Sequence, residues 1–156
     1  MTEEFAERRT VDGRLIERVA RPELAVRLGL EPHPEGGWYR RTWAAAQQVA
    51  VDGRTRPLAT SIVFLLPAGE ASAWHLVTSD ELWIWSGVGS VQLQLGGTGD
   101  APVPGEVHVV GDARDGHLTQ ALVPGGVWQR TLPADHDALV SCIVSPGFDF
   151  ADFTLE

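Results

Sequence analysis

One histidine and one glutamate lie six residues apart in SAWHLVTSDELWIWSG, residues 72–87. His75 is near the end of one predicted strand (72–77), and Glu81 begins the next (81–86) after a short Thr-Ser-Asp connection. Side chains at these places in a hairpin can face the same cavity. An imidazole beside a carboxylate can transfer protons or bind a metal ion, so His75 and Glu81 are the first candidate catalytic residues.

Two tryptophans follow Glu81 at alternating positions. Because successive side chains of a strand point to opposite faces, Glu81, Trp83 and Trp85 are predicted to share one face. A carboxyl group beside two indoles lies in a medium of low dielectric constant, which raises its pKa or requires a partner such as His75 or a metal. Trp83 and Trp85 are candidate contacts for a planar or sugar ring, with ordinary packing as the alternative.

Two further side chains are candidate substrate contacts. Gln129 follows the tight turn Pro-Gly-Gly and is predicted to share a face with Val127. Tyr39 is the only tyrosine of the chain and lies on a predicted strand, where its hydroxyl would serve as an acid. The segment HPEGG (33–37) that precedes this strand is interpreted first as a rigid turn, with His33 and Glu35 reaching the mouth of a barrel as the alternative.

The elements around these residues predict an all-β domain. The 17 glycines and 10 prolines are spread along the chain and separate roughly nine to eleven short predicted strands. One short helix is expected after Pro22, ending at Gly29. Residues 1–20 are predicted to be a loosely attached or mobile arm, and residues 21–156 a single domain. The other predicted strands are 38–43, 59–66, 90–95, 107–110, 119–123, 127–132 and 138–144.

Composition excludes several classes of function. The formal net charge is -9, which disfavours nucleic acid as a partner. The chain has no lysine, which excludes Schiff-base chemistry and a Walker-type phosphate site. Cys142, the only cysteine, is expected to be a buried and inert thiol. The charged N-terminus and the absence of a long apolar run predict a cytoplasmic protein without a membrane partner.

Five segments in order resemble a known family. The segments are HPEGGWYRRTW (33–43), SAWH (72–75), SDELW (79–83), VPGGVWQ (123–129) and SPGFDFADF (145–153). Together they are similar to one subfamily of RmlC-like cupins of unknown function. The resemblance implies a double-stranded β-helix, that is, a jelly-roll barrel, which usually forms a homodimer. It also makes Gln120 a pocket candidate, because the subfamily often carries a glutamine there.

The chain departs from the metal-binding cupins at two ligand positions. The first cupin motif supplies two histidines and a glutamate, and the second motif a further histidine. Here Val77 and Gln129 stand at two of the histidine positions, so a metal site would consist of His75, Glu81 and Gln129. A carboxamide is a weak ligand for transition metals. Leu76 and Ile84 replace an arginine and a histidine common in the subfamily, which makes the surroundings more apolar.

Three hypotheses about function follow. The first is an isomerase or epimerase that binds a sugar-like or carbonyl metabolite, with His75 as general base and Glu81 as its partner or acid. The second is a cupin enzyme that uses one divalent ion (Fe, Mn, Ni or Zn) on His75, Glu81 and Gln129. The third is a barrel that binds or senses a metabolite without catalysis.

Overall fold

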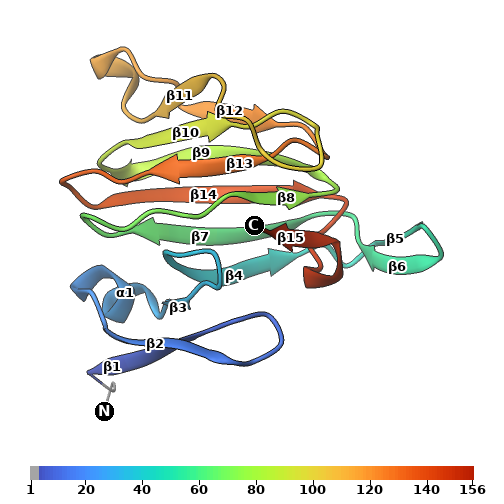
Figure 1. Cartoon of the computed structure of the whole chain (residues 1–156), viewed down its shortest axis with the longest axis horizontal. Coiled ribbons are helices and arrows are strands. Elements are labelled where there is room, and N and C mark those ends of the chain that lie inside the picture. Colours follow the sequence, from blue (N-terminus) through green and yellow to red (C-terminus); the bar gives the residue numbers. More distant parts are fainter. Residues whose placement is uncertain (1–3) are drawn as a thin grey trace.

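Two antiparallel β-sheets lie face to face in the computed structural model, which describes residues 4–156 (Figure 1). The six-stranded sheet has the order β12 (Gln120–Val123), β9 (Asp80–Val88), β14 (Ala138–Ser145), β7 (Thr60–Leu66), β4 (Trp38–Ala44), β3 (Glu31–Pro32). The five-stranded sheet has the order β11 (Val107–Val110), β10 (Val91–Leu95), β13 (Gln129–Leu132), β8 (His75–Val77), β15 (Phe153–Leu155). The prediction of an all-β fold is confirmed.

The central strands show why this sequence forms sheets. In β14, Ala138, Val140, Cys142 and Val144 alternate with less buried residues, so one face of the strand points into the interior. β7 pairs on one side with β14 and on the other with β4, and it is apolar along most of its length. The main hydrophobic core fills the space between the sheets.

Short elements flank the sheets. Helix α1 (Glu23–Leu28) ends at Gly29, which has a left-handed backbone (φ 67°), as the sequence predicts. A hairpin of β5 (Gln48–Val51) and β6 (Arg54–Pro57) projects at the right of Figure 1, on the side of the C-terminal segment. Two 3-10 turns, η1 (Ala113–Asp115) and η2 (Phe150–Asp152), complete the regular structure of the described residues.

The N-terminal residues differ from the loose arm that the sequence suggests. Strands β1 (Phe5–Arg9) and β2 (Leu15–Ala20) form a hairpin, and Ala6 joins a second hydrophobic cluster with Trp38. The hairpin contributes few apolar side chains to the core, and its sequence is rich in charged residues. The sequence therefore shows no alternation that would predict these strands. Met1 to Glu3 lie outside the described residues, and the domain boundary at residue 21 remains a prediction.

Arg8 attaches this hairpin to the turn that follows β3. Its guanidinium donates hydrogen bonds to the carbonyl oxygens of His33 (2.6 Å) and Gly37 (2.8 Å), and it forms an ion pair with Glu70. Glu70 in turn accepts hydrogen bonds from the Gly37 amide (2.9 Å) and the Trp38 indole (3.2 Å). Arg8 is only 4% exposed, so these contacts are shielded from water.

The other predicted strands are present, but some begin or end at different residues. The strand expected over 72–77 begins only at His75, because residues 72–74 run irregularly beside β13 and the turn after β3. Strands β5, β6 and β15 were not predicted, since they are short and carry charged or turn-forming residues. Within residues 4–156, no helix is long and apolar enough to cross a membrane.

Replacing Arg8 by methionine should lower the free energy of unfolding by about 2–4 kcal/mol, because two carbonyl groups and Glu70 lose a buried partner. Arg9→Met is the matched control: Arg9 is exposed and pairs only with Glu7 and the Gly13 carbonyl, so its loss should cost less than about 1 kcal/mol. Urea denaturation measures both. Equal stability of the two variants would contradict the role given to Arg8.

Candidate functional site

A cavity of about 530 Å³ opens between the two sheets at the end where β15 and the β5–β6 hairpin lie. Its volume is within the range of small-molecule sites. Aromatic side chains make up much of the wall: Tyr39, Phe64, Trp83, Phe148, Phe150 and Phe153. The polar and charged lining groups include His33, Glu35, Arg41, Arg56, His75 and Glu81.

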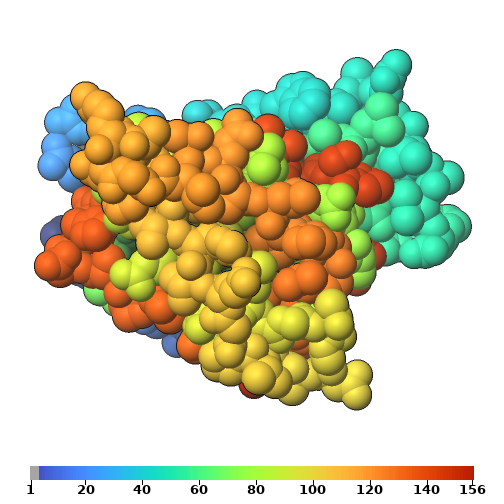
Figure 2. Space-filling view, turned by 90° about the horizontal axis from the view of Figure 1, so that it is seen from above, coloured from blue at the N-terminus to red at the C-terminus, as the bar shows by residue number. Residues whose placement is uncertain are grey.

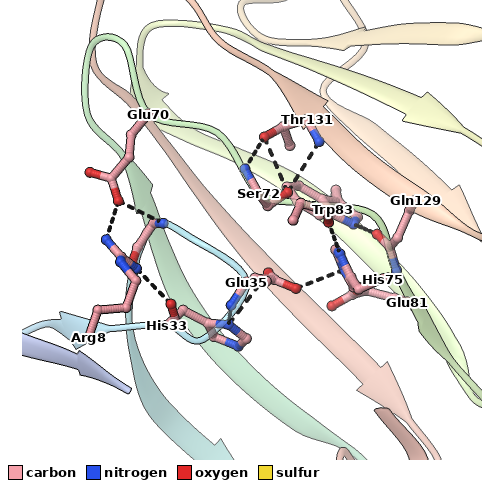
Figure 3. Close-up of polar contacts among 12 residues, drawn as sticks. Arg8, His33, Glu35, Glu70, Ser72, His75, Glu81, Trp83, Gln129 and Thr131 are labelled. Atoms are coloured by element: carbon pink, nitrogen blue, oxygen red, sulfur yellow. Dashed lines mark hydrogen bonds and ion pairs between the residues drawn. The ribbon is translucent and has the colours of Figure 1, made fainter. Parts of the chain in front are cut away.

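His75 lies on β8, opposite Gln129 of β13, and it is 2% exposed. Its Nδ1 is 2.8 Å from the Ala73 carbonyl oxygen, to which it donates, and its Nε2 is 3.0 Å from Glu35 Oε2 (Figure 3). Burial lowers the pKa of His75 to about 4, so the imidazole is neutral at pH 7 and Nε2 carries a lone pair. That lone pair faces Glu35 Oε2, and a proton on Glu35 makes this contact a hydrogen bond.

Glu35 is the third residue of the HPEGG turn between β3 and β4. Burial raises the pKa of its carboxyl group well above the ordinary value, and the nearby Glu81 raises it further. Its backbone carbonyl oxygen accepts a hydrogen bond from the Ala73 amide (2.7 Å). Glu35 and His75 are therefore joined twice, directly through their side chains and indirectly through Ala73.

The two glycines of HPEGG allow this turn to lie where it does. Gly36 (φ 106°) and Gly37 (φ 77°) both have left-handed backbones. A Cβ atom on Gly36 would overlap the Ala71 carbonyl oxygen, and one on Gly37 would lie 2.6 Å from the Phe64 ring. The turn can thus pack against β7 and the segment before β8 only with glycine at both positions.

Glu81, on β9, faces the same cavity from the six-stranded sheet. Gln129 donates a hydrogen bond from Nε2 to Glu81 Oε1 (2.7 Å), and the Trp83 indole donates to Gln129 Oε1 (2.9 Å). This relay from Trp83 through Gln129 orients the Glu81 carboxyl group (Figure 3). Burial raises the pKa of Glu81 to about 7, and the hydrogen bond from Gln129 limits that rise.

His33 and Tyr39 form the wall next to Glu35. The two rings meet edge to face with centroids 4.5 Å apart. His33 Nδ1 accepts a hydrogen bond from the Glu35 amide (3.2 Å), and burial lowers the pKa of His33 to about 3, so this ring is also neutral. Burial raises the pKa of Tyr39, which keeps its hydroxyl protonated.

The structure places most of the predicted site residues together. His75, Glu81, Trp83 and Tyr39 line the cavity, and Cys142 is buried as expected and also contributes to the lining. Gln129 does not reach the cavity, and its carboxamide is occupied by Glu81 and Trp83. The roles of these residues remain predictions.

Besides Gln129, two placements need correction. Trp85 shares a strand with Glu81 but packs against the hydrophobic core farther along β9, where its indole donates to the Gly89 carbonyl oxygen (2.9 Å). Gln120 is exposed and lies on β12, at the edge of the six-stranded sheet, so it does not line the cavity. For Trp85, alternation predicted at most the face of the strand and not the position along the barrel, whereas Gln120 was a candidate only through the family resemblance.

Sequence reasoning did not select several polar lining residues, among them His33, Glu35, Arg41 and Arg56. His33 and Glu35 were interpreted as turn residues, although the HPEGG motif was the signal that could have found them. Arg41 was not singled out at all, but it follows Tyr39 by two residues on β4 and therefore points to the same side.

The predicted metal ligands do not fit a metal site. Both polar atoms of the Gln129 side chain are already hydrogen-bonded, Val77 stands at a ligand position, and His75 Nε2 faces Glu35. In residues 4–156, no group of three or more His, Cys, Asp and Glu side chains is placed to hold an ion.

The mouth of the cavity lies where the C-terminal segment meets the β5–β6 hairpin. Figure 2 shows the C-terminal residues (red) against this hairpin (turquoise). Ion pairs join the two parts: Asp152 pairs with Arg54 and, at 2.7 Å, with Arg56, and Asp149 is 3.6 Å from Arg54. Arg56 is buried, so its pairing with Asp152 is shielded from solvent.

Comparison with known proteins identifies the family. The model described as "Cupin superfamily (DUF985)" matches residues 22–156. The chain belongs to this family. A hypothetical protein from Leishmania major is 34% identical to this cupin, with a TM-score of 0.75 over 85% of this chain and 84% of that chain. A protein from Shewanella oneidensis is also 34% identical, with a TM-score of 0.75 over 86% and 82% of the two chains.

More distant structures show the fold alone. Oxalate decarboxylase from Bacillus subtilis is 15% identical to this cupin, with a TM-score of 0.54 over 80% of this chain and 29% of that chain. KdgF from a Halomonas species is 13% identical, with a TM-score of 0.53 over 76% and 86%. The predicted jelly-roll fold is thereby confirmed. Among curated proteins, none matches this cupin.

The raised pKa of Glu81 predicts how stability depends on pH. Between pH 4.5 and about 7 the folded chain keeps a proton on Glu81 that the unfolded chain has lost. Its contribution to stability is therefore complete below pH 4.5 and is lost as the pH rises through about 7. We expect the difference in unfolding free energy between wild type and Glu81→Gln to fall by on the order of 3 kcal/mol across this range.

Denaturation curves at a series of pH values measure this difference. Glu106→Gln, a change at an exposed position, should follow wild type throughout. A difference between wild type and Glu81→Gln that stays constant with pH would show that Glu81 does not titrate in this range.

Proposed function

We propose that this cupin binds a small carbonyl metabolite in the cavity and catalyses proton transfer at carbon, as isomerases and epimerases do. The observation that supports this best is that two carboxyl groups with different proton affinities line one cavity. Glu35 is protonated and hydrogen-bonded to neutral His75, whereas Glu81 exchanges its proton near neutral pH. Pairs of titratable groups with separated pKa values are typical of acid–base catalysis.

The geometry favours a change in the roles expected from the sequence. His75 is engaged through both ring nitrogens, one with Ala73 and one with Glu35, so it is not free to act alone as the base. Glu81 has one carboxylate oxygen held by Gln129 and lines the cavity. We therefore assign Glu81 as the base and Glu35 as the acid, with His75 Nε2 as the acceptor that holds the Glu35 proton until a substrate carbonyl oxygen takes its place.

The proposed reaction keeps its atoms and charges in balance. The Glu81 carboxylate removes a proton from a carbon next to the substrate carbonyl, and the electron pair of that C–H bond forms the enol double bond. The Glu35 carboxyl group donates its proton to the carbonyl oxygen at the same time. For the isomer, Glu81 delivers its proton to the former carbonyl carbon, and Glu35 takes the proton of the adjacent hydroxyl group. For the epimer, water delivers a proton to the opposite face of the carbon, Glu35 recovers the enol proton, and Glu81 releases its own proton to water. Side chains and water can perform each transfer.

The walls support a substrate that has both polar and apolar parts. Trp83, Phe64 and the phenylalanines near the C-terminus offer ring faces, and Tyr39 offers a protonated hydroxyl. Such a surface suits the apolar face of a sugar or a planar group. The apolar environment also strengthens the hydrogen bonds of the acid–base residues, because few water molecules compete with them.

Hydrogen–deuterium exchange at carbon tests the reaction even when the product is unidentified. Small aldoses, ketoses and 2-oxo compounds are incubated in deuterated water with the protein, and loss of the C–H signal is followed by NMR. Glu81→Gln and Glu35→Gln should each slow exchange by about 10²–10⁴-fold, whereas Glu106→Gln should not. Binding without exchange would favour a metabolite-binding barrel, and unchanged exchange in His75→Ala would remove His75 from the mechanism.

The exchange rate should also depend on pH in a defined way. Because Glu81 acts as the base, the rate rises as Glu81 loses its proton around pH 7. It falls again at higher pH when Glu35, whose pKa is well above its ordinary value, can no longer supply a proton. A bell-shaped profile for the wild type is therefore expected. A rate that is flat from mild acid to neutral pH would exclude Glu81 as the base.

A further inference from the structure

Arg41 is a charged lining residue that the acid–base chemistry does not use. It lies on β4 opposite Ile62, two residues after Tyr39, and all three side chains line the cavity. Its Nη2 donates a hydrogen bond to the Phe148 carbonyl oxygen (3.1 Å), which holds the guanidinium beside the C-terminal segment. Across residues 4–156, no carboxylate forms an ion pair with Arg41.

The other cations at the mouth are already paired. Arg56 also lines the cavity, but it is buried against Asp152. Arg54 pairs with Asp149 and Asp152. Among the described residues that line the cavity, Arg41 is thus the arginine whose charge is available to a ligand. Its position matters in a chain with a net charge of -9, whose overall potential repels anions.

The interior offers no competing positive charge. His33 and His75 are neutral because burial lowers the pKa of both rings. An anionic group on a ligand would therefore be attracted to the mouth, and the uncharged part of the ligand would extend toward Glu35 and Glu81. Guanidinium groups bind carboxylates and phosphates through two parallel hydrogen bonds, which fixes orientation as well as position.

The charge count favours a single negative charge. Asp149 lines the same mouth, and its nearest cation, Arg54, is 3.6 Å away. A phosphate dianion would meet one free guanidinium and an aspartate, whereas a carboxylate matches the one positive charge of Arg41. The ring centroids of Phe148, Phe150 and Phe153 lie 4.9–6.0 Å from one another, and the rings meet edge to face. They provide an apolar surface beside Arg41.

From these contacts we infer that Arg41 binds the carboxylate of a small organic acid, so that the substrate class is a carbonyl compound that carries one carboxylate group. The phenylalanines hold the apolar body of this acid, and Phe153, whose ring centroid is 5.7 Å from that of His75, connects the mouth with the acid–base residues. This inference rests on the proposed function, because it assumes that a small molecule occupies the cavity.

Matched pairs of ligands test the inference. The probes are carboxylic acids of roughly four to ten carbon atoms, including 2-oxo acids, with the primary amide and the phosphate monoester of the same body. Calorimetric titration measures affinity in wild type, Arg41→Gln and Arg41→Lys. Arg40→Gln is the control, because Arg40 is the neighbouring arginine of β4 and does not line the cavity.

In wild type, acids should bind at least about tenfold more tightly than their amides. Added salt should weaken the binding of the acids but not that of the amides. The preference for acids should disappear in Arg41→Gln, return in part in Arg41→Lys, and persist in Arg40→Gln. Circular dichroism checks that the variants are folded, which is expected for substitutions of exposed residues.

The outcomes separate this inference from the proposed function. Equal binding of acids and amides to wild type, or an unchanged preference in Arg41→Gln, would overturn the role of Arg41 and leave a small-molecule site in place. Tighter binding of phosphate esters than of acids would overturn the single-charge argument. If none of the probes binds, the proposed function fails and the inference fails with it.

Discussion

The site depends on one buried hydrogen bond, between the carboxyl group of Glu35 and Nε2 of His75. It joins the two halves of the barrel, since Glu35 belongs to the turn before β4 of one sheet and His75 to β8 of the other. Because both groups are removed from water, each is more stable without charge, and the neutral pair satisfies both polar atoms. If either partner were charged alone, an uncompensated buried charge would destabilise the surrounding core.

The same constraint explains the arrangement around Glu81. A carboxyl group buried in an aromatic wall requires a donor, and Gln129 supplies it while Trp83 fixes the orientation of Gln129. A histidine at position 129, as in metal-binding cupins, would present a ring nitrogen to an ion. The glutamine presents an amide donor to a carboxylate. With glutamine at this position the side chain pairs with Glu81 and Trp83 and presents no ring nitrogen to an ion, which is consistent with function residing in the site and not in the fold.

Much of the fold could be predicted from local pattern. The alternation in 138–144, the apolar strand 59–66 and the helix stop at Gly29 each reflect a preference that acts over a few residues. That His75 and Glu81 face one cavity was also accessible from their spacing, but the expected hairpin is wrong: β8 and β9 belong to different sheets, and the two side chains meet the cavity from opposite sides. Glu35 was not accessible in this way: it comes from a turn 40 residues earlier, and only the packing of Gly36 and Gly37 against Ala71 and Phe64 brings it to His75. Trp85 failed for the opposite reason, since periodicity says nothing about depth along a barrel, and Gln120, a candidate through the family resemblance, lies exposed on the edge strand β12.

The ion pair between Arg8 and Glu70 bears on how the domain is delimited. Similarity to the family begins at residue 22, so an outline drawn from sequence comparison alone excludes the first hairpin. Yet the guanidinium of Arg8 holds the carbonyl groups at both ends of the turn that carries Glu35. In this protein, the segment that matches the family is therefore shorter than the segment that holds the turn in place. The β1–β2 hairpin lies outside the matched segment and supports the turn of Glu35, which lies inside it.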